Sequence, residues 1–137
     1  MARSMVLGNG NTMVCLDKFG QARDFYFPYV GQENHIGSNQ MHKMGVFVDD
    51  RMHWIDDGEW NIDIGFEKNT MVSKMTALND RARISMQTSD VVYNEKNIFL
   101  RKIVLTNNDS KTRNIKIFLN QQFKIGDTNH ADTAYFS

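Results

Sequence analysis

Five acidic residues are the candidates for acid–base chemistry in this sequence: Asp24, Glu33, Asp56, Asp57 and Glu59. General acid and base catalysis by paired carboxyl groups requires surroundings that keep one of them protonated. Asp56 and Asp57 directly precede Gly58 and are better explained as turn formers. Asp24 lies in an aromatic segment, where we expect it to pair with Arg23 or with a backbone donor. We therefore expect no catalytic residue in this chain.

Glu33 belongs to a run of four polar side chains that follows a proline-ended aromatic segment: Gln32, Glu33, Asn34 and His35. Loops carried by a rigid sheet commonly hold binding groups. Two explanations stay open. These side chains line a substrate entrance or a domain interface, or they satisfy backbone groups of their own loop. The sequence places no partner carboxylate beside Glu33.

The remaining reactive residue types show no spacing that indicates a metal or a cofactor. Metal-ligand spacing of the H-x-x-x-H kind is absent from the four histidines, which are expected in loops or at the surface: His35, His42, His53 and His130. Cys15 lies in an apolar run and is expected to be an inert core thiol, and as the only cysteine it forms no intrachain disulfide. The run from Gly8 to Gly10 has Met13 where a dinucleotide fingerprint has glycine, so we predict a turn.

Three aromatic side chains could present flat apolar faces to sugar rings: Tyr29, Trp54 and Trp60. Aromatic side chains also contribute strongly to the packing of cores and interfaces. Because most of the aromatic residues fall within strand patterns, we favour packing in the core or against another domain.

Composition limits the classes of partner. The 137 residues are 41% apolar and 23% charged, which is ordinary for one globular domain with a core. Sixteen basic residues balance sixteen acidic ones, which argues against a nucleic-acid-binding surface. No apolar run is long enough to cross a bilayer, and residues 5–7 are too short for a signal peptide core. We expect a cytoplasmic protein without nucleic-acid or membrane partners.

Short strands are the elements that must carry these residues. Apolar and polar residues alternate at 43–48, 82–88 and 114–123, and turn signals recur about every ten residues. Residues 12–16 and 21–27 are predicted to pair as a hairpin around the turn at 17–20. Helical periodicity is lacking. The pattern predicts an all-β fold, an antiparallel β-sandwich of about eight or nine strands.

An ordered set of motifs opens the chain. Residues 7–20 hold a GNG turn, a strand and a D-x-x-G turn, and residues 23–35 hold an aromatic strand that ends in proline and the sequence VGQENH. This order resembles the opening of prokaryotic family 15 glycoside hydrolases, the glucoamylase, glucodextranase and trehalase-like group. Residues 105–107, 113–118 and 132–135 are similar to later strands of the same domain.

The resemblance implies that residues 1–137 form the front part of an N-terminal super-sandwich, similar in fold to galactose mutarotase, which continues beyond Ser137. In that group the domain precedes an (α/α)6 barrel whose two glutamates cleave α-glucosidic bonds with inversion. This chain lacks the barrel. The expected function is that of a non-catalytic accessory domain that packs on the barrel and meets carbohydrate through the parent enzyme. An isolated part of such a domain would expose unpaired strand edges, so we expect self-association.

Two other functions are compatible with the same sequence. An independent carbohydrate-binding module would bind malto-oligosaccharides as the isolated chain, whereas a supporting domain would not. A mutarotase-like sugar epimerase would catalyse anomerisation. The parent's substrate stays open among starch fragments, dextran and trehalose, because a fold does not determine a substrate.

Overall fold

A computed structural model describes residues 2–31, 33–36 and 41–124, and all regular structure in these ranges is β. The strands are β1 (Met5–Gly8), β2 (Met13–Leu16), β3 (Ala22–Tyr26), β4 (Lys43–Val48), β5 (Arg51–Trp54), β6 (Asn61–Phe66), β7 (Ser73–Asn79), β8 (Ile84–Val92), β9 (Phe99–Asn107) and β10 (Lys116–Asn120). All their pairings are antiparallel, which confirms the predicted fold class. The described residues include no helix that could cross a membrane.

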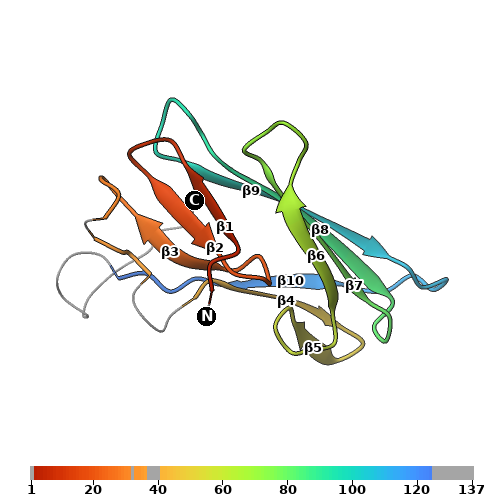
Figure 1. The fold of residues 1–137 in the computed structure, drawn as a ribbon. Coiled ribbons are helices and arrows are strands. Elements are labelled where there is room, and N and C mark those ends of the chain that lie inside the picture. The colour runs from red at the N-terminus through yellow and green to blue at the C-terminus, as the bar shows by residue number, and fades with distance from the viewer. Residues whose placement is uncertain (1, 32, 37–40, 125–137) are drawn as a thin grey trace.

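The strands form two layers. One layer is the four-stranded sheet β6-β7-β8-β9. The other combines the sheets β1-β2-β3 and β10-β4-β5, which are joined by an isolated bridge between Ala22 and His42 (Figure 1). One core cluster lies between β4 and the strands β7 and β8, and a second packs β1–β3 against Val92 of β8. The arrangement is that of a β-sandwich.

Alternation along the strands builds this core. Ile84 and Met86 of β8 point inward and are buried, as are Met44, Val46 and Val48 of β4. Each such side chain contributes about 1.5–3 kcal/mol when fully buried. A shift of one residue in register would turn the whole set to solvent, so the pattern fixes the pairing. The alternation predicted at 43–48 and 82–88 is confirmed.

The turns have the backbone conformations that their residue types favour. Asp49 and Asp50 have φ angles of 50° and 57° and form the two-residue connection between β4 and β5, as a type I′ turn requires. Gly20 has a φ of 69°, and a Cβ there would lie 2.8 Å from the sulfur of Met75. Its turn therefore needs glycine for both its backbone conformation and its close packing. The turn predicted at 17–20 is confirmed.

The N-terminal sheet contains one strand more than the predicted hairpin. Residues 5–8 form β1, which pairs with β2 and buries Met5 and Leu7. The connecting turn is held by Asn9, whose Oδ1 accepts hydrogen bonds from the backbone N–H groups of Asn11 and Thr12. The GNG segment is thus a turn, as predicted.

At the other end of the chain, the strand predicted within 114–123 is present as β10, with Ile117 and Leu119 on one face as predicted, but its residues are not buried. All five residues of β10 are exposed, including Ile117, Phe118 and Leu119. The reason is that β10 is the outer strand of its sheet, with β4 on one side only among the described strands.

Arg101 of β9 connects all three sheets. Its guanidinium forms two hydrogen bonds with the carboxylate of Asp90 on β8, at 2.6 and 2.8 Å. It also donates to the backbone oxygen of Gly20, which precedes β3, at 2.6 Å and contacts the sulfur of Met44 on β4. Asp90 is buried and accepts a further hydrogen bond from Ser73 of β7. A charge-assisted, two-point contact therefore lies where the sheets meet.

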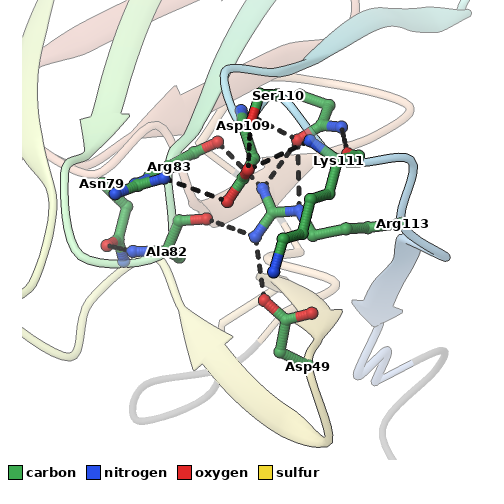
Figure 2. A network of polar contacts seen from close by, with 9 residues as sticks. Asp49, Asn79, Ala82, Arg83, Asp109, Ser110, Lys111 and Arg113 are labelled. Carbon is green, nitrogen blue, oxygen red and sulfur yellow. Dashed lines mark hydrogen bonds and ion pairs between the residues drawn. The ribbon is translucent and has the colours of Figure 1, made fainter.

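A second arginine closes one end of the sandwich. Figure 2 shows the guanidinium of Arg113 among groups from three separate turns. It donates to Asp49 between β4 and β5, to the backbone oxygens of Ala82 and Arg83 between β7 and β8, and to Asn107 at the end of β9, over 2.7–3.1 Å. The side chain is buried, so these contacts fix the spacing of the two layers at this end.

Arg113→Ala is expected to lower the free energy of unfolding by about 2–4 kcal/mol, because it leaves two backbone oxygens and an amide without their charged donor. Urea denaturation measures this. The matched control is Arg81→Ala, whose exposed side chain makes one ion pair at 3.5 Å and should change stability by about 0.5 kcal/mol or less. Equal losses for the two variants would contradict a structural role specific to Arg113.

Candidate functional site

The polar loop lies against β3. After β3 ends at Tyr26 the chain folds back, and an isolated bridge joins Tyr26 to Asn34. Ile36 is fully buried in the second core cluster and fixes the end of the loop to the core. Gln32, one of the four predicted binding residues, lies outside the described residues. The other three are held at the edge of the N-terminal sheet.

Asn34 links the loop to a charged pair. Its side-chain oxygen accepts hydrogen bonds from the backbone N–H groups of Phe25 and Ile36, and its amide donates to Asp24 at 2.7 Å. The guanidinium of Arg3 also donates to both carboxylate oxygens of Asp24. The asparagine therefore satisfies backbone groups of its own loop.

The predicted pairing of Asp24 with Arg23 is wrong. Neighbouring residues of a strand point to opposite faces, so these two side chains cannot meet. Arg23 instead pairs with the buried Asp17 at 2.7 Å, and Asp24 pairs with Arg3. The hydrogen bond from Arg3 lowers the pKa of Asp24, against the effect of burial.

His35 and Glu33 differ in whether their polar side-chain atoms have hydrogen-bond partners. The ring nitrogens of His35 lie 2.7 Å from the backbone oxygen of Phe27 and 3.2 Å from that of Lys124, which ties the loop to the segment after β10. Glu33 is half-buried, and its Oε1 has no hydrogen-bond partner among the described residues. Of the loop side chains described, Glu33 is the one with a buried acceptor that has no partner among the described residues.

Three carboxyl groups of the described residues have shifted pKa values. A general acid at neutral pH needs a raised pKa, whereas the shifted carboxyl pKa values there are lowered, those of Asp24, Glu59 and Asp109. Hydrogen bonds lower the last two, from the His53 ring to Glu59 and from the Lys111 backbone to Asp109.

Asp56 and Asp57 have structural partners as well. Asp56 forms an ion pair with Lys43 at 3.3 Å, and Asp57 accepts a hydrogen bond from the backbone N–H of Glu59 at 2.8 Å. Both lie in the turn after β5, as predicted from Gly58.

One group of side chains has metal-ligand character. Ligand atoms of His53, Asp57 and Glu59 lie within 4.8 Å of one another, and such nitrogen and carboxylate donors suit a zinc ion. Glu59, however, also pairs with Arg51 and Arg81, and His53 Nδ1 is already 2.8 Å from its carboxylate. The two arginines thus already neutralise the Glu59 carboxylate that a cation would need. The contacts of this cluster hold the turn after β5 in place.

Two histidine predictions are wrong. His42 and His53 are buried rather than in surface loops. His53 tolerates burial because Glu59 hydrogen-bonds its ring, a contact encoded by the H-x5-E spacing that the sequence analysis did not use. Cys15 is buried as predicted, and burial raises the pKa of its thiol, which keeps it unreactive.

The three aromatic candidates do not form one platform. Trp60 packs in the first core cluster, which removes its faces from solvent. Trp54 is half-buried with the ammonium group of Lys43 over its ring at 5.4 Å. Tyr29 is exposed beside the polar loop and is free to stack on a ligand.

A pocket of about 510 Å³ opens where the three sheets meet. Its walls come from Phe25 of β3, from Phe99 and Ile103 of β9, and from Leu119 and Phe123 in and after β10. The sequence analysis did not predict this pocket, because its walls come from strands up to about a hundred residues apart in the chain.

His42 supplies the buried polar group of this pocket. Burial lowers its pKa from 6.5 to about 4, a hydrogen bond to the Gln122 backbone opposes this shift, and the charge of Arg101 adds to it. The imidazole is therefore neutral at pH 7, and its Nε2 has no hydrogen-bond partner among the residues that the structure describes. With the other ring nitrogen donating to the Gln122 oxygen, Nε2 is an acceptor.

The titration of His42 predicts a pH dependence. Between pH 6.5 and about 4 the unfolded chain binds a proton at His42 and the folded chain does not, so stability falls as the pH falls. The loss between pH 6.5 and 5 is expected to be about 2 kcal/mol by urea denaturation. His42→Phe keeps a ring against Phe123 and should remove most of this slope. The same slope in both proteins would contradict the assignment.

Comparison with known proteins finds one relative among the curated proteins. An uncharacterised glycosyl hydrolase of Methanocaldococcus jannaschii is 23% identical to this chain over 131 residues. The match covers 96% of the chain and 20% of the relative, so the chain spans about a fifth of the length of the protein it matches. No protein-family model and no solved structure matches the chain. The chain is thus a distant homologue of part of a protein named a glycosyl hydrolase.

Proposed function

We propose that this chain is a non-catalytic β-sandwich module of a glycoside hydrolase that acts on α-glucosidic bonds. In this proposal it is the front part of a super-sandwich, and it supports an (α/α)6 catalytic barrel in the same cytoplasmic polypeptide. Carbohydrate binds to the parent enzyme rather than to the module. The main support is the similarity of almost the whole chain to one fifth of a protein named a glycosyl hydrolase.

The chemistry of the described residues supports a non-catalytic role. Hydrolysis with inversion needs one protonated and one ionised carboxyl group about 6.5–9.5 Å apart, with the scissile bond between them. The candidate carboxylates Asp24, Asp56, Asp57 and Glu59 are used in ion pairs or turns.

The surface supports a module that is covered by another part of the protein. Large apolar side chains are exposed along β9, β10 and the segments next to them: Ile98, Leu100, Val104, Ile117, Phe118, Leu119 and Phe123. Exposed apolar side chains in this number on two neighbouring parts of the fold favour an interaction surface there. In isolation, the chain is expected to self-associate through it.

The assignment predicts that the isolated chain neither hydrolyses nor measurably binds maltotriose, isomaltotriose or trehalose. The protein encoded by the complete reading frame is expected to hydrolyse at least one of them. Calorimetric titration and release of glucose measure the two properties. Affinity of the isolated chain for maltotriose would indicate a carbohydrate-binding module instead, and anomerisation of glucose by it would indicate an epimerase. A reading frame that stops after Ser137 would also overturn the proposal.

Glu33 tests the role of the polar loop in the complete protein. Glu33→Gln removes a charge without breaking a described hydrogen bond, so the melting temperature of the isolated chain should change by about 1 °C or less. In the complete protein we expect a lower melting temperature or a several-fold lower kcat/KM, because in this proposal the loop that holds the Glu33 carboxylate meets the barrel or the substrate. His35→Ala is a less clean test, because it also removes the contacts to Phe27 and Lys124. Unchanged kinetics and melting for Glu33→Gln would limit the loop to a local role.

A further inference from the structure

Two histidines hold the segment that follows β10. The backbone oxygen of Gln122 accepts a hydrogen bond from His42, and the rings of Phe123 and His42 pack with their centroids 4.6 Å apart. The backbone N–H of Lys124 then donates to the backbone oxygen of His35, on the loop after β3, at 2.6 Å. Figure 1 shows this loop and the segment after β10 at the same end of their layer. The segment is thus attached to the sandwich at two points.

The His35 ring faces a carbonyl oxygen at each of its two nitrogens. Nε2 lies 2.7 Å from the backbone oxygen of Phe27, and Nδ1 lies 3.2 Å from that of Lys124. Carbonyl oxygens only accept hydrogen bonds, and a neutral imidazole has one N–H donor and one acceptor nitrogen. The neutral ring can therefore bond one of the two oxygens and must place a lone pair against the other. The imidazolium ring has an N–H on both nitrogens and can bond both oxygens.

The surroundings of His35 are compatible with a charged ring. The side chain is half-buried, so solvent can reach it. The titratable groups on the described segments that contact it are Glu33, Tyr26, Lys124 and the pair of Asp24 with Arg3. The two carboxylates and two cations of this set leave no net charge around the ring. The ring of His42, by contrast, is buried and meets the charge of Arg101.

We infer that His35 is a proton-dependent latch between the loop after β3 and the segment after β10. An imidazole ordinarily gains its proton at a pH of about 6.5, and below that pH the ring bonds both Phe27 and Lys124. Above it one of the two bonds is lost, and the attachment of Lys124 weakens. The attachment at His42 stays constant in this range, because burial lowers the pKa of that ring to about 4.

The latch consists of contacts within the chain and does not depend on the proposed function. One consequence does rest on that function: in the complete protein, the pH would change how firmly the loop that meets the barrel or the substrate is held.

Hydrogen exchange at the Lys124 backbone N–H measures the latch, because this group bonds to His35 and can open locally without unfolding of the sandwich. Its protection factor is expected to fall about tenfold between a pH of about 5.5 and a pH of about 8, the effect of losing one hydrogen bond from a charged donor. The measurement is made on residues 1–137 and on the complete protein. His35→Gln does not titrate, so its protection should be low and independent of pH. Glu33→Gln and His42→Phe are matched controls that should keep the wild-type dependence.

The ring itself gives a second measurement that needs no variant. Nitrogen-15 NMR of the His35 imidazole should show protons on both nitrogens at the lower pH and on one nitrogen at the higher pH. A single protonated nitrogen at both pH values, or equal protection of Lys124 at both, would overturn the latch. So would a wild-type pH dependence in His35→Gln, or its loss in either control, because another group would then be responsible. None of these results involves glycosidase activity, so the latch and the proposed function can fail separately.

Discussion

The buried pair of Arg101 and Asp90 is the interaction on which the arrangement of the three sheets depends. Removing a guanidinium and a carboxylate from water is costly, and only complete hydrogen bonding offsets that cost. Asp90 and Ser73 supply partners within one layer, while Gly20 and Met44 supply contacts from the other. The pair can therefore be satisfied only when both parts of the second layer are in place. The relative position of the sheets is therefore fixed by the hydrogen bonds of this buried ion pair as well as by apolar packing.

The sequence predicts the strands better than it predicts their contacts. Two-residue alternation is a local property, and it identified β4 and β8 from their own residues. The role of Arg101 could not be read in that way, because a charged residue at an inward position resembles a break in the pattern. Its meaning comes from the register, which places it directly opposite Asp90 in the β8–β9 pair. β1 was missed for a related reason: residues 5–7 are three consecutive apolar residues, and only their pairing with β2 shows that Met5 and Leu7 face the core while Val6 does not.

The features of the candidate site also differ in whether they depend on local sequence or on distant contacts. The polar run around Glu33 was visible in the sequence, and its connection to the segment after β10 through His35 was not, since that contact spans 89 residues. Burial of His42 likewise depends on β9 and on residues after β10. A histidine gives no local sign of whether distant strands will cover it. That Asp24 does not pair with Arg23, by contrast, follows from the strand period alone. Its actual partner, Arg3, lies 21 residues away in the chain and could not be predicted in that way.

Charge in this chain divides between groups that hold the fold and groups that face solvent. The carboxylates with shifted pKa values are each held by a donor within the chain, and Arg101 and Arg113 are occupied by groups from several turns. These contacts connect the turns of the sandwich, whereas lysines such as Lys68, Lys74 and Lys102 are exposed on its surface. The arginines can serve in this way because a guanidinium has several donors in fixed directions and bonds to groups from more than one turn at once. The fold therefore depends on its arginines, and the exposed lysines are the cations left to face solvent.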